Sequence, residues 1–144
     1  EQLPALGHVL MSGEPLLPND VRRWQAVFGE RVQLVNLYGA TETTLVRCFH
    51  RVTAGDAERD FIPVGRPMAG TRAIVLDANR QICPPGMSGE LWLRTAWGTL
   101  GYYRQPERTA QVFVRDLFDG AGLARGEVVY RSGDLAMWLE DGTL

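Results

Sequence analysis

Lysine is absent from this chain, so all fifteen of its basic side chains are arginine. These residues therefore cannot form a Schiff base through lysine, use lysine as a general base or hold phosphate with a Walker-type lysine. A strong charge of either sign is lacking too, because seventeen acidic side chains leave a net charge of −2. A nucleic-acid-binding surface needs a basic excess, so we expect no nucleic-acid partner.

Long apolar runs are also missing from the sequence. None approaches the roughly 18 residues that a membrane span requires, and no signal-peptide pattern opens the chain. Hydrophobic residues make up 45% of the sequence, which indicates a globular protein with a core. We therefore expect no membrane partner.

Cysteine and histidine are scarce. Cys48 and Cys83 stand 35 positions apart, and no spacing typical of a zinc site involves them or the two histidines. Without a signal peptide, two isolated cysteines indicate buried reduced thiols and a cytoplasmic protein. Cys48 and His50 would share one face of a strand, where packing is a more common role than nucleophilic catalysis.

The first third of the chain has the pattern of a β-α-β unit. Residues 6–11 and 31–38 are apolar runs typical of strands, and the helical spacing between them begins after Asn19 as N-cap and ends at Gly29. Such a crossover makes two parallel strands. Both strands then end at the same edge of the sheet, where open α/β sheets bind ligands.

The remainder of the chain has β periodicity. A turn at residues 84–86 predicts a hairpin, Pro106 predicts the start of a short helix that ends near Phe113, and Asp141-Gly142 predicts a second turn. We expect strands at residues 44–52, 71–77, 89–95, 128–131 and 134–139, and a surface loop at 53–60. Because the chain stops inside a hairpin, we expect it to be a piece of a larger protein.

These patterns predict an α/β fold in two parts. Residues 1–52 would be the end of a parallel α/β sheet subdomain, and residues 53–144 would be a β-rich subdomain that is truncated at its C-terminal end.

The segment Gly39–Thr44 follows the second predicted strand. Its small residues let backbone N–H groups approach an anion, and its hydroxyls can donate to phosphate oxygens. A carboxylate beside a phosphate is repelled unless a cation lies between them, so Glu42 is best explained as a Mg²⁺ ligand shared with nucleotide phosphates. The alternative is a helix that starts near Glu42 and is capped by Thr41.

Three further side chains suit a nucleoside. Tyr38 offers an aromatic face and Asn36 offers an amide on the same face of the strand, so a purine could stack on the one and bond to the other. Asp134 could accept two hydrogen bonds from a ribose diol. Packing at the sheet edge for Tyr38 and Asn36, and a plain turn at Asp134, are the alternatives.

Several segments follow one another along most of the chain in a recognisable order. They are Asn36-Leu37-Tyr38-Gly39-Ala40-Thr41-Glu42, Pro63-Val64-Gly65-Arg66-Pro67, Gly89-Glu90-Leu91, Gly101-Tyr102 with Pro106-Glu107-Arg108-Thr109-Ala110, and Tyr130-Arg131-Ser132-Gly133-Asp134-Leu135. In this order they resemble the adenylation domains of nonribosomal peptide synthetases, within the superfamily of adenylate-forming acyl and aryl ligases. The chain is similar to an internal fragment of the large N-terminal core, and the resemblance implies that the β-rich part is a distorted barrel. Ala40, Leu100 and Ser132 depart from the usual Pro, Arg and Thr, but no ligand group is lost.

The resemblance implies an ATP-dependent ligase with two-step chemistry. A substrate carboxylate attacks the α-phosphate of ATP, pyrophosphate leaves, and the acyl group of the acyl-adenylate then passes to the phosphopantetheine thiol of a carrier protein. By position, the resemblance implies that Tyr38 stacks on adenine, Asn36 bonds to the adenine amine and Asp134 holds the ribose. Thr41 would contact the α-phosphate, and Glu42 would hold Mg²⁺. The adenine and phosphates would be lined by the backbone of Gly13, Glu14, Pro15 and Gly39.

The same resemblance implies a substrate pocket and partners. Four aliphatic side chains and one hydroxyl would line the pocket, which favours a neutral, mostly apolar amino acid or other carboxylic acid: Leu10, Ser12, Leu37, Leu45 and Val46. The expected partners are a carrier-protein domain, the rest of the adenylation domain and an MbtH-like protein. The family's catalytic lysine lies outside these residues, so we expect the chain alone to be inactive. An acyl- or aryl-CoA ligase and a non-catalytic adenylation-like platform are the alternatives.

Overall fold

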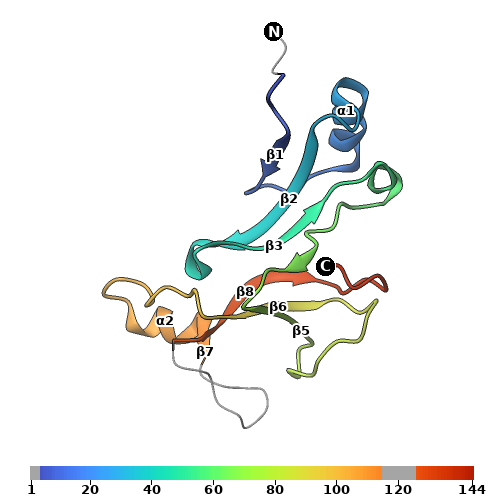
Figure 1. Cartoon of the computed structure of the whole chain (residues 1–144). Helices are drawn as coiled ribbons and strands as arrows, with labels where there is room; N and C mark the ends of the chain where they lie inside the picture. The colour runs from blue at the N-terminus through green and yellow to red at the C-terminus, as the bar shows by residue number, and fades with distance from the viewer. Residues whose placement is uncertain (1–3, 115–125) are drawn as a thin grey trace.

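The β-α-β unit predicted from the sequence opens the fold. The computed structural model describes residues 4–114 and 126–144. In it, β1 (His8–Met11) and β2 (Gln33–Ala40) pair in parallel, and α1 (Pro18–Phe28) connects them. β3 (Leu45–Arg51) returns antiparallel to β2, and the short β4 (Arg66–Pro67) pairs with β3 (Figure 1). The first sheet therefore has the order β1-β2-β3-β4.

The N-cap of α1 lies two residues before the predicted N-cap, Asn19. Leu17 is the N-cap, because Pro18 suits the first helical position, where an N–H has no partner in any case. The Asp20 carboxylate accepts a hydrogen bond from the Leu17 N–H at 3.3 Å. The helix ends before Gly29 as predicted, and it packs Val21 against the sheet residue Leu34 in a small apolar cluster.

The prediction of a surface loop at residues 53–60 is wrong in part. Ala54–Glu58 form a short 3₁₀ helix, η2, in which Asp56 is buried. Its carboxylate contacts the Thr53 N–H at 2.7 Å, His50 at 2.9 Å and Arg59 at 3.0 Å. Burial raises the pKa of Asp56, but the hydrogen bonds from Thr53 and His50 outweigh it and lower the pKa below its usual value. His50 thus has a structural partner.

The second sheet is antiparallel throughout. Its strands are β5 (Thr71–Leu76), β6 (Gly89–Thr95), β7 (Phe113–Val114) and β8 (Val128–Ala136), in the order β5-β6-β8-β7. The β5-β6 hairpin agrees with the prediction, as does α2 (Pro106–Val112). β8 is one strand where the sequence predicts two, because a shift in its register with β6 accommodates Gly133 at φ +77°.

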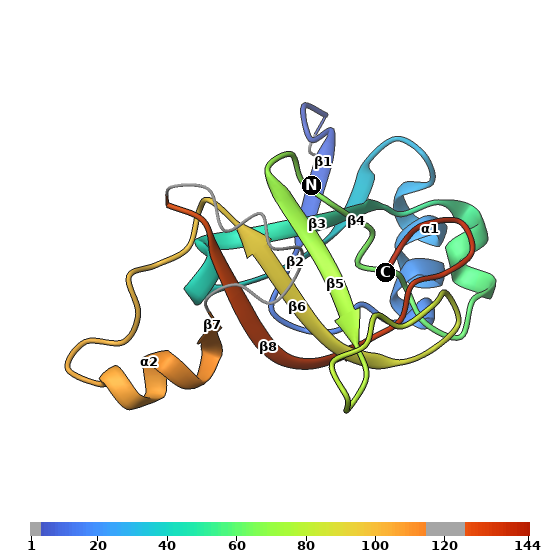
Figure 2. The same cartoon turned by 90° about the horizontal axis from the view of Figure 1, so that it is seen from below.

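The two sheets share a core. In Figure 2, β5, β6 and β8 lie across β2 and β3. Buried side chains from both sheets, from the β5-β6 connection and from residue 144 fill the space between the sheets, and Tyr38, Val64 and Trp138 pack against this group: Cys48, Val75, Cys83, Leu91, Leu93 and Leu144. Both cysteines are free and buried, as predicted. Among the described residues, no helix is long and apolar enough to cross a membrane.

Candidate functional site

The carboxyl half of β2 leads directly into the predicted phosphate loop. A short 3₁₀ helix, η1 (Thr41–Thr43), follows β2 and places Thr41 and Glu42 at the tip of a tight reversal into β3. Gly39 permits this close return, because a Cβ there would lie 1.7 Å from the Leu45 carbonyl oxygen. Thr44, at φ 57°, completes the reversal. Ala40, not Thr41, is the N-cap residue of η1.

Tyr38 and Asp134 meet where the two sheets approach each other. The Tyr38 hydroxyl donates to Oδ2 of Asp134 at 2.5 Å, and the Asp134 N–H donates to Ser132 Oγ at 3.0 Å. Burial and this hydrogen bond raise the pKa of the Tyr38 hydroxyl, which therefore stays a donor. Asp134 is exposed, so its second oxygen is open to a ligand.

Glu42 is held in place by two residues of the segment that follows β6. The Tyr102 hydroxyl donates to Oε1 of Glu42, and the Thr99 N–H donates to the Glu42 carbonyl oxygen at 2.8 Å. Burial of Tyr130 and the nearby Glu42 carboxylate raise the pKa of Tyr130 to about 12. Sequence reasoning gave Tyr102 no role, although the Gly101-Tyr102 pair was among the matching segments.

The remaining predicted residues lie along the first sheet. Gly13, at φ +97°, and its neighbours Ser12, Glu14 and Pro15 are exposed just beyond the end of β1. Asn36 is buried, and its Nδ2 donates to the Pro63 carbonyl oxygen at 2.9 Å.

The predicted pocket residues are spread over three strands. Leu10 on β1 lies opposite Val35, and Leu37 lies two positions further along β2. Leu45 and Val46 face Ala40 and Gly39 across the β2-β3 reversal. Leu10 and Leu45 are exposed in this chain, at 62% and 70% of their surface.

The donor set around Glu42 decides which metal would suit it. Within the described part of the chain, no three metal-ligating side chains cluster together. Glu42 therefore offers one partly exposed carboxylate, with Oε1 already bonded to Tyr102. This arrangement fits Mg²⁺, which is commonly bound by one or two carboxylates together with substrate phosphates and water.

Comparison with known proteins now identifies the family. The model of the family described as "AMP-binding enzyme" matches residues 1–103. The chain belongs to the AMP-binding enzyme family. The chain is 40% identical to phosphinothricin tripeptide synthetase PhsB of Streptomyces viridochromogenes, over 97% of the chain and 11% of that synthetase. It spans between 2% and 12% of the length of the curated relatives it matches.

Solved structures agree with the sequence relatives. PA1221, an NRPS protein containing adenylation and PCP domains, is 36% identical with a TM-score of 0.88, over 99% of this chain and 28% of that one. The Vibrio cholerae adenylation domain AlmE, in complex with glycyl-adenosine-5'-phosphate, is 28% identical with a TM-score of 0.77, over 98% and 26%. The resemblance to adenylation domains and the predicted α/β fold class are both confirmed.

Proposed function

We propose that this chain is part of an adenylation domain that activates an amino acid or a related carboxylic acid with ATP. The proposal depends mainly on two carboxylates, Glu42 in η1 and Asp134 on β8, which each accept a hydrogen bond from a tyrosine. A nucleoside triphosphate needs an acceptor for its ribose hydroxyls and a ligand for its bound cation. These two carboxylates supply both.

The nucleoside would lie beside Tyr38. The ring of Tyr38 would stack on adenine, while Oδ1 of Asp134 would accept from the ribose, since Oδ2 accepts from Tyr38. Asn36 uses one N–H on Pro63. Its second N–H and its carbonyl oxygen would bond to the adenine edge, although the side chain is only 3% exposed in this structure. The backbone of Gly39 and of residues 13–15 would line the adenine and phosphates.

The phosphates would lie over η1. An oxygen of the substrate carboxylate forms a bond to the α-phosphorus as the bond from that phosphorus to the pyrophosphate oxygen breaks. The exposed Thr41 hydroxyl would donate to the α-phosphate, which stabilises the charge that develops there. Glu42 would hold Mg²⁺, whose charge neutralises the phosphates. The catalytic lysine would come from another part of the full-length protein, so the 144 residues alone would be inactive.

Substrate and partners follow from the same proposal. The pocket formed by Leu10, Ser12, Leu37, Leu45 and Val46 would accept a neutral, mostly apolar side chain. AlmE is bound to glycyl-adenosine-5'-phosphate and PA1221 contains a PCP domain. These neighbours support an amino acid as substrate and a phosphopantetheine-bearing carrier domain as acceptor. The rest of the adenylation domain and an MbtH-like protein would complete the assembly.

Substrate-dependent exchange of pyrophosphate into ATP tests the proposal. The full-length protein should catalyse exchange with one or a few amino acids, and Glu42→Gln should lower the rate by about 100-fold or more. Glu30→Gln is the matched control, because Glu30 is an exposed glutamate in the turn after α1.

Three results would contradict this assignment. Equal rates of pyrophosphate exchange in the Glu42→Gln and Glu30→Gln variants would contradict the proposed role of Glu42 as Mg²⁺ ligand. A folded full-length protein without exchange for any acid would favour a non-catalytic platform. Transfer of the acyl group to free coenzyme A in place of a carrier domain would favour a CoA ligase.

A further inference from the structure

Tyr102 contacts the proposed metal ligand from a segment to which no function is yet assigned. It lies between β6 and α2, 60 positions from Glu42 in the sequence, and its hydroxyl donates to Oε1 of Glu42. A carboxylate with one oxygen fixed in this way cannot rotate freely. Its other oxygen, Oε2, therefore points in a defined direction.

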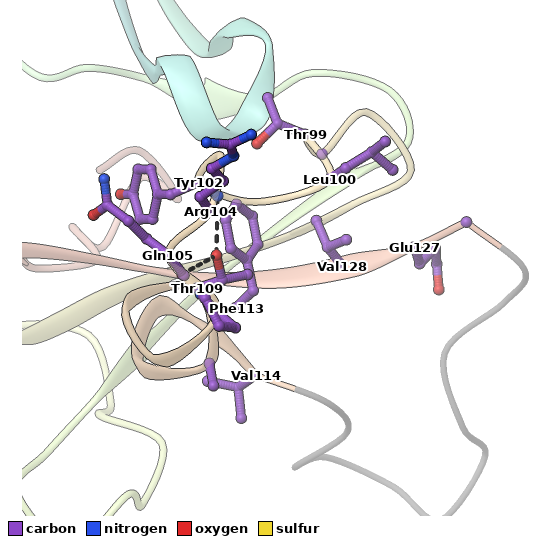
Figure 3. Close-up of a pocket in the computed structure, with 14 residues that line it drawn as sticks. Thr99, Leu100, Tyr102, Arg104, Gln105, Thr109, Phe113, Val114, Glu127 and Val128 are labelled. Carbon is purple, nitrogen blue, oxygen red and sulfur yellow. Dashed lines mark hydrogen bonds between the residues drawn. The ribbon is translucent and has the colours of Figure 1, made fainter.

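The backbone of Tyr102 is itself fixed. Figure 3 shows Thr109 beneath it: the Tyr102 N–H donates to Thr109 Oγ1 at 2.9 Å, and that hydroxyl donates to the Gln105 carbonyl oxygen at 2.9 Å. Gly101, at φ +114°, leaves no room for a side chain, since a Cβ would lie 2.4 Å from Thr109 Cγ2. The first turn of α2 therefore determines where the Tyr102 hydroxyl can reach.

The ring of Tyr102 is held as well. The Arg108 guanidinium lies over it at 4.4 Å from the ring centroid, and the Phe113 ring lies at a centroid distance of 6.4 Å in a tilted orientation. Such a cation–π contact restricts the position of the ring. Three separate contacts thus hold one phenol oxygen against Glu42.

The loop that carries Glu42 does not depend on this hydroxyl for its fold. The Thr99 N–H donates to the Glu42 carbonyl oxygen at 2.8 Å, and Thr44 Oγ1 donates to the Trp97 carbonyl oxygen at 2.8 Å. These bonds already join η1 to the segment after β6. Tyr130 also hydrogen-bonds to the Glu42 side chain. Removal of the Tyr102 phenol oxygen alone should therefore leave the backbone in place and loosen the carboxylate at Oε1.

We propose that Tyr102 is a positioning residue that orients the Glu42 carboxylate, so that Oε2 faces the divalent cation of the bound nucleotide. This inference rests on the proposed function, because it requires Glu42 to bind that cation. Partners that orient a metal ligand typically contribute about 10–100-fold to metal affinity. The partner here is a neutral phenol, which can fix one carboxylate oxygen without competing with the metal cation for that carboxylate, as a lysine or arginine would.

Binding of Mn²⁺ to the full-length protein in the presence of a non-hydrolysable ATP analogue tests the inference. Electron paramagnetic resonance measures free Mn²⁺ directly, without turnover. Tyr102→Phe should weaken Mn²⁺ binding by about tenfold and leave the affinity for the analogue in EDTA unchanged. Tyr103→Phe is the control, because Tyr103 is an exposed neighbour, 82% accessible, whose ring contacts Arg104.

Two further measurements separate positioning from a purely structural role. In pyrophosphate exchange, Tyr102→Phe should raise the Mg²⁺ concentration for half-maximal rate, and excess Mg²⁺ should restore the rate. The double variant with Glu42→Gln should bind Mn²⁺ no more weakly than Glu42→Gln alone, because Tyr102 acts through Glu42.

The outcomes can be told apart. Unchanged Mn²⁺ affinity in Tyr102→Phe, or an equal loss in Tyr103→Phe, would overturn the role of Tyr102 while the proposed function stands. Wild-type Mn²⁺ affinity in Glu42→Gln would instead overturn the metal role of Glu42, and this inference with it. If Tyr102→Phe fails to fold, as judged by circular dichroism, the assignment of this bond as dispensable for the fold is wrong and the inference is overturned too.

Discussion

The Tyr38 hydroxyl and the Asp134 carboxylate, 96 positions apart in the sequence, lie 2.5 Å from each other and connect the two sheets. Tyr38 belongs to β2 and Asp134 to β8, so the bond spans the junction between them. A similar connection joins Glu42 to Tyr102. The proposed nucleotide site is therefore built from paired side chains across a sheet junction.

Tyr38→Phe should remove this connection and little else. A hydrogen bond to a charged group contributes about 1.5–3 kcal/mol, and because Asp134 is exposed we expect a loss near the lower value. Urea unfolding of the full-length protein, with Tyr103→Phe as control, measures it. If Tyr38→Phe unfolds at the same urea concentration as the control, the bond does not stabilise the sheet junction.

Gly39→Ala should destabilise the protein strongly. The added Cβ would lie 1.7 Å from the Leu45 carbonyl oxygen, and backbone on both sides would have to move. We expect a loss of at least about 2 kcal/mol in the free energy of unfolding. Gly7→Ala is the control, because an added Cβ there meets no described atom within 4 Å, and it should cost less than about 0.5 kcal/mol. Equal losses in both variants would contradict the close approach at Gly39.

Alkaline pH should destabilise the protein through Cys48. Burial raises the pKa of its thiol from 9.0 to about 12, so the unfolded chain loses this proton first. The contribution of Cys48 to stability is therefore complete below pH 9 and decreases between pH 9 and 12, by about 1.4 kcal/mol per pH unit. Cys48→Ala should flatten the decline measured by thermal unfolding between pH 8.5 and 10. An unchanged slope would show that the thiol titrates normally.

A bulky side chain at the proposed pocket should change substrate choice. Replacement of Val46 or Ser12 by tryptophan should alter the ratio of exchange rates between small and large acids by about tenfold or more. Affinity for ATP should stay the same. Val27→Trp on the exposed face of α1 is the control. Equal loss of acid and ATP binding in a folded variant would contradict the pocket assignment.

Local sequence patterns are enough to predict most of the helices and strands. The apolar spacing of residues 21–28, the Gly29 stop and the turn at residues 84–86 correctly predict α1 and the β5-β6 hairpin, because these signals act between neighbours in the chain. The start of α1 was misplaced because Pro18 outweighs Asn19. The burial of Asp56 was missed, since its partner His50 lies on a strand and its burial comes from the packing of η2 against α1.

The sequence by itself determined the family, since ordered segments from Asn36 to Leu135 resemble adenylation domains, and it singled out Glu42 and Asp134 as the chemically informative carboxylates. It also determined that no lysine can act here. Only the tertiary structure decided which groups hold those carboxylates. Tyr38 and Tyr102 reach them across 96 and 60 residues, and such contacts depend on how two sheets pack rather than on any local spacing.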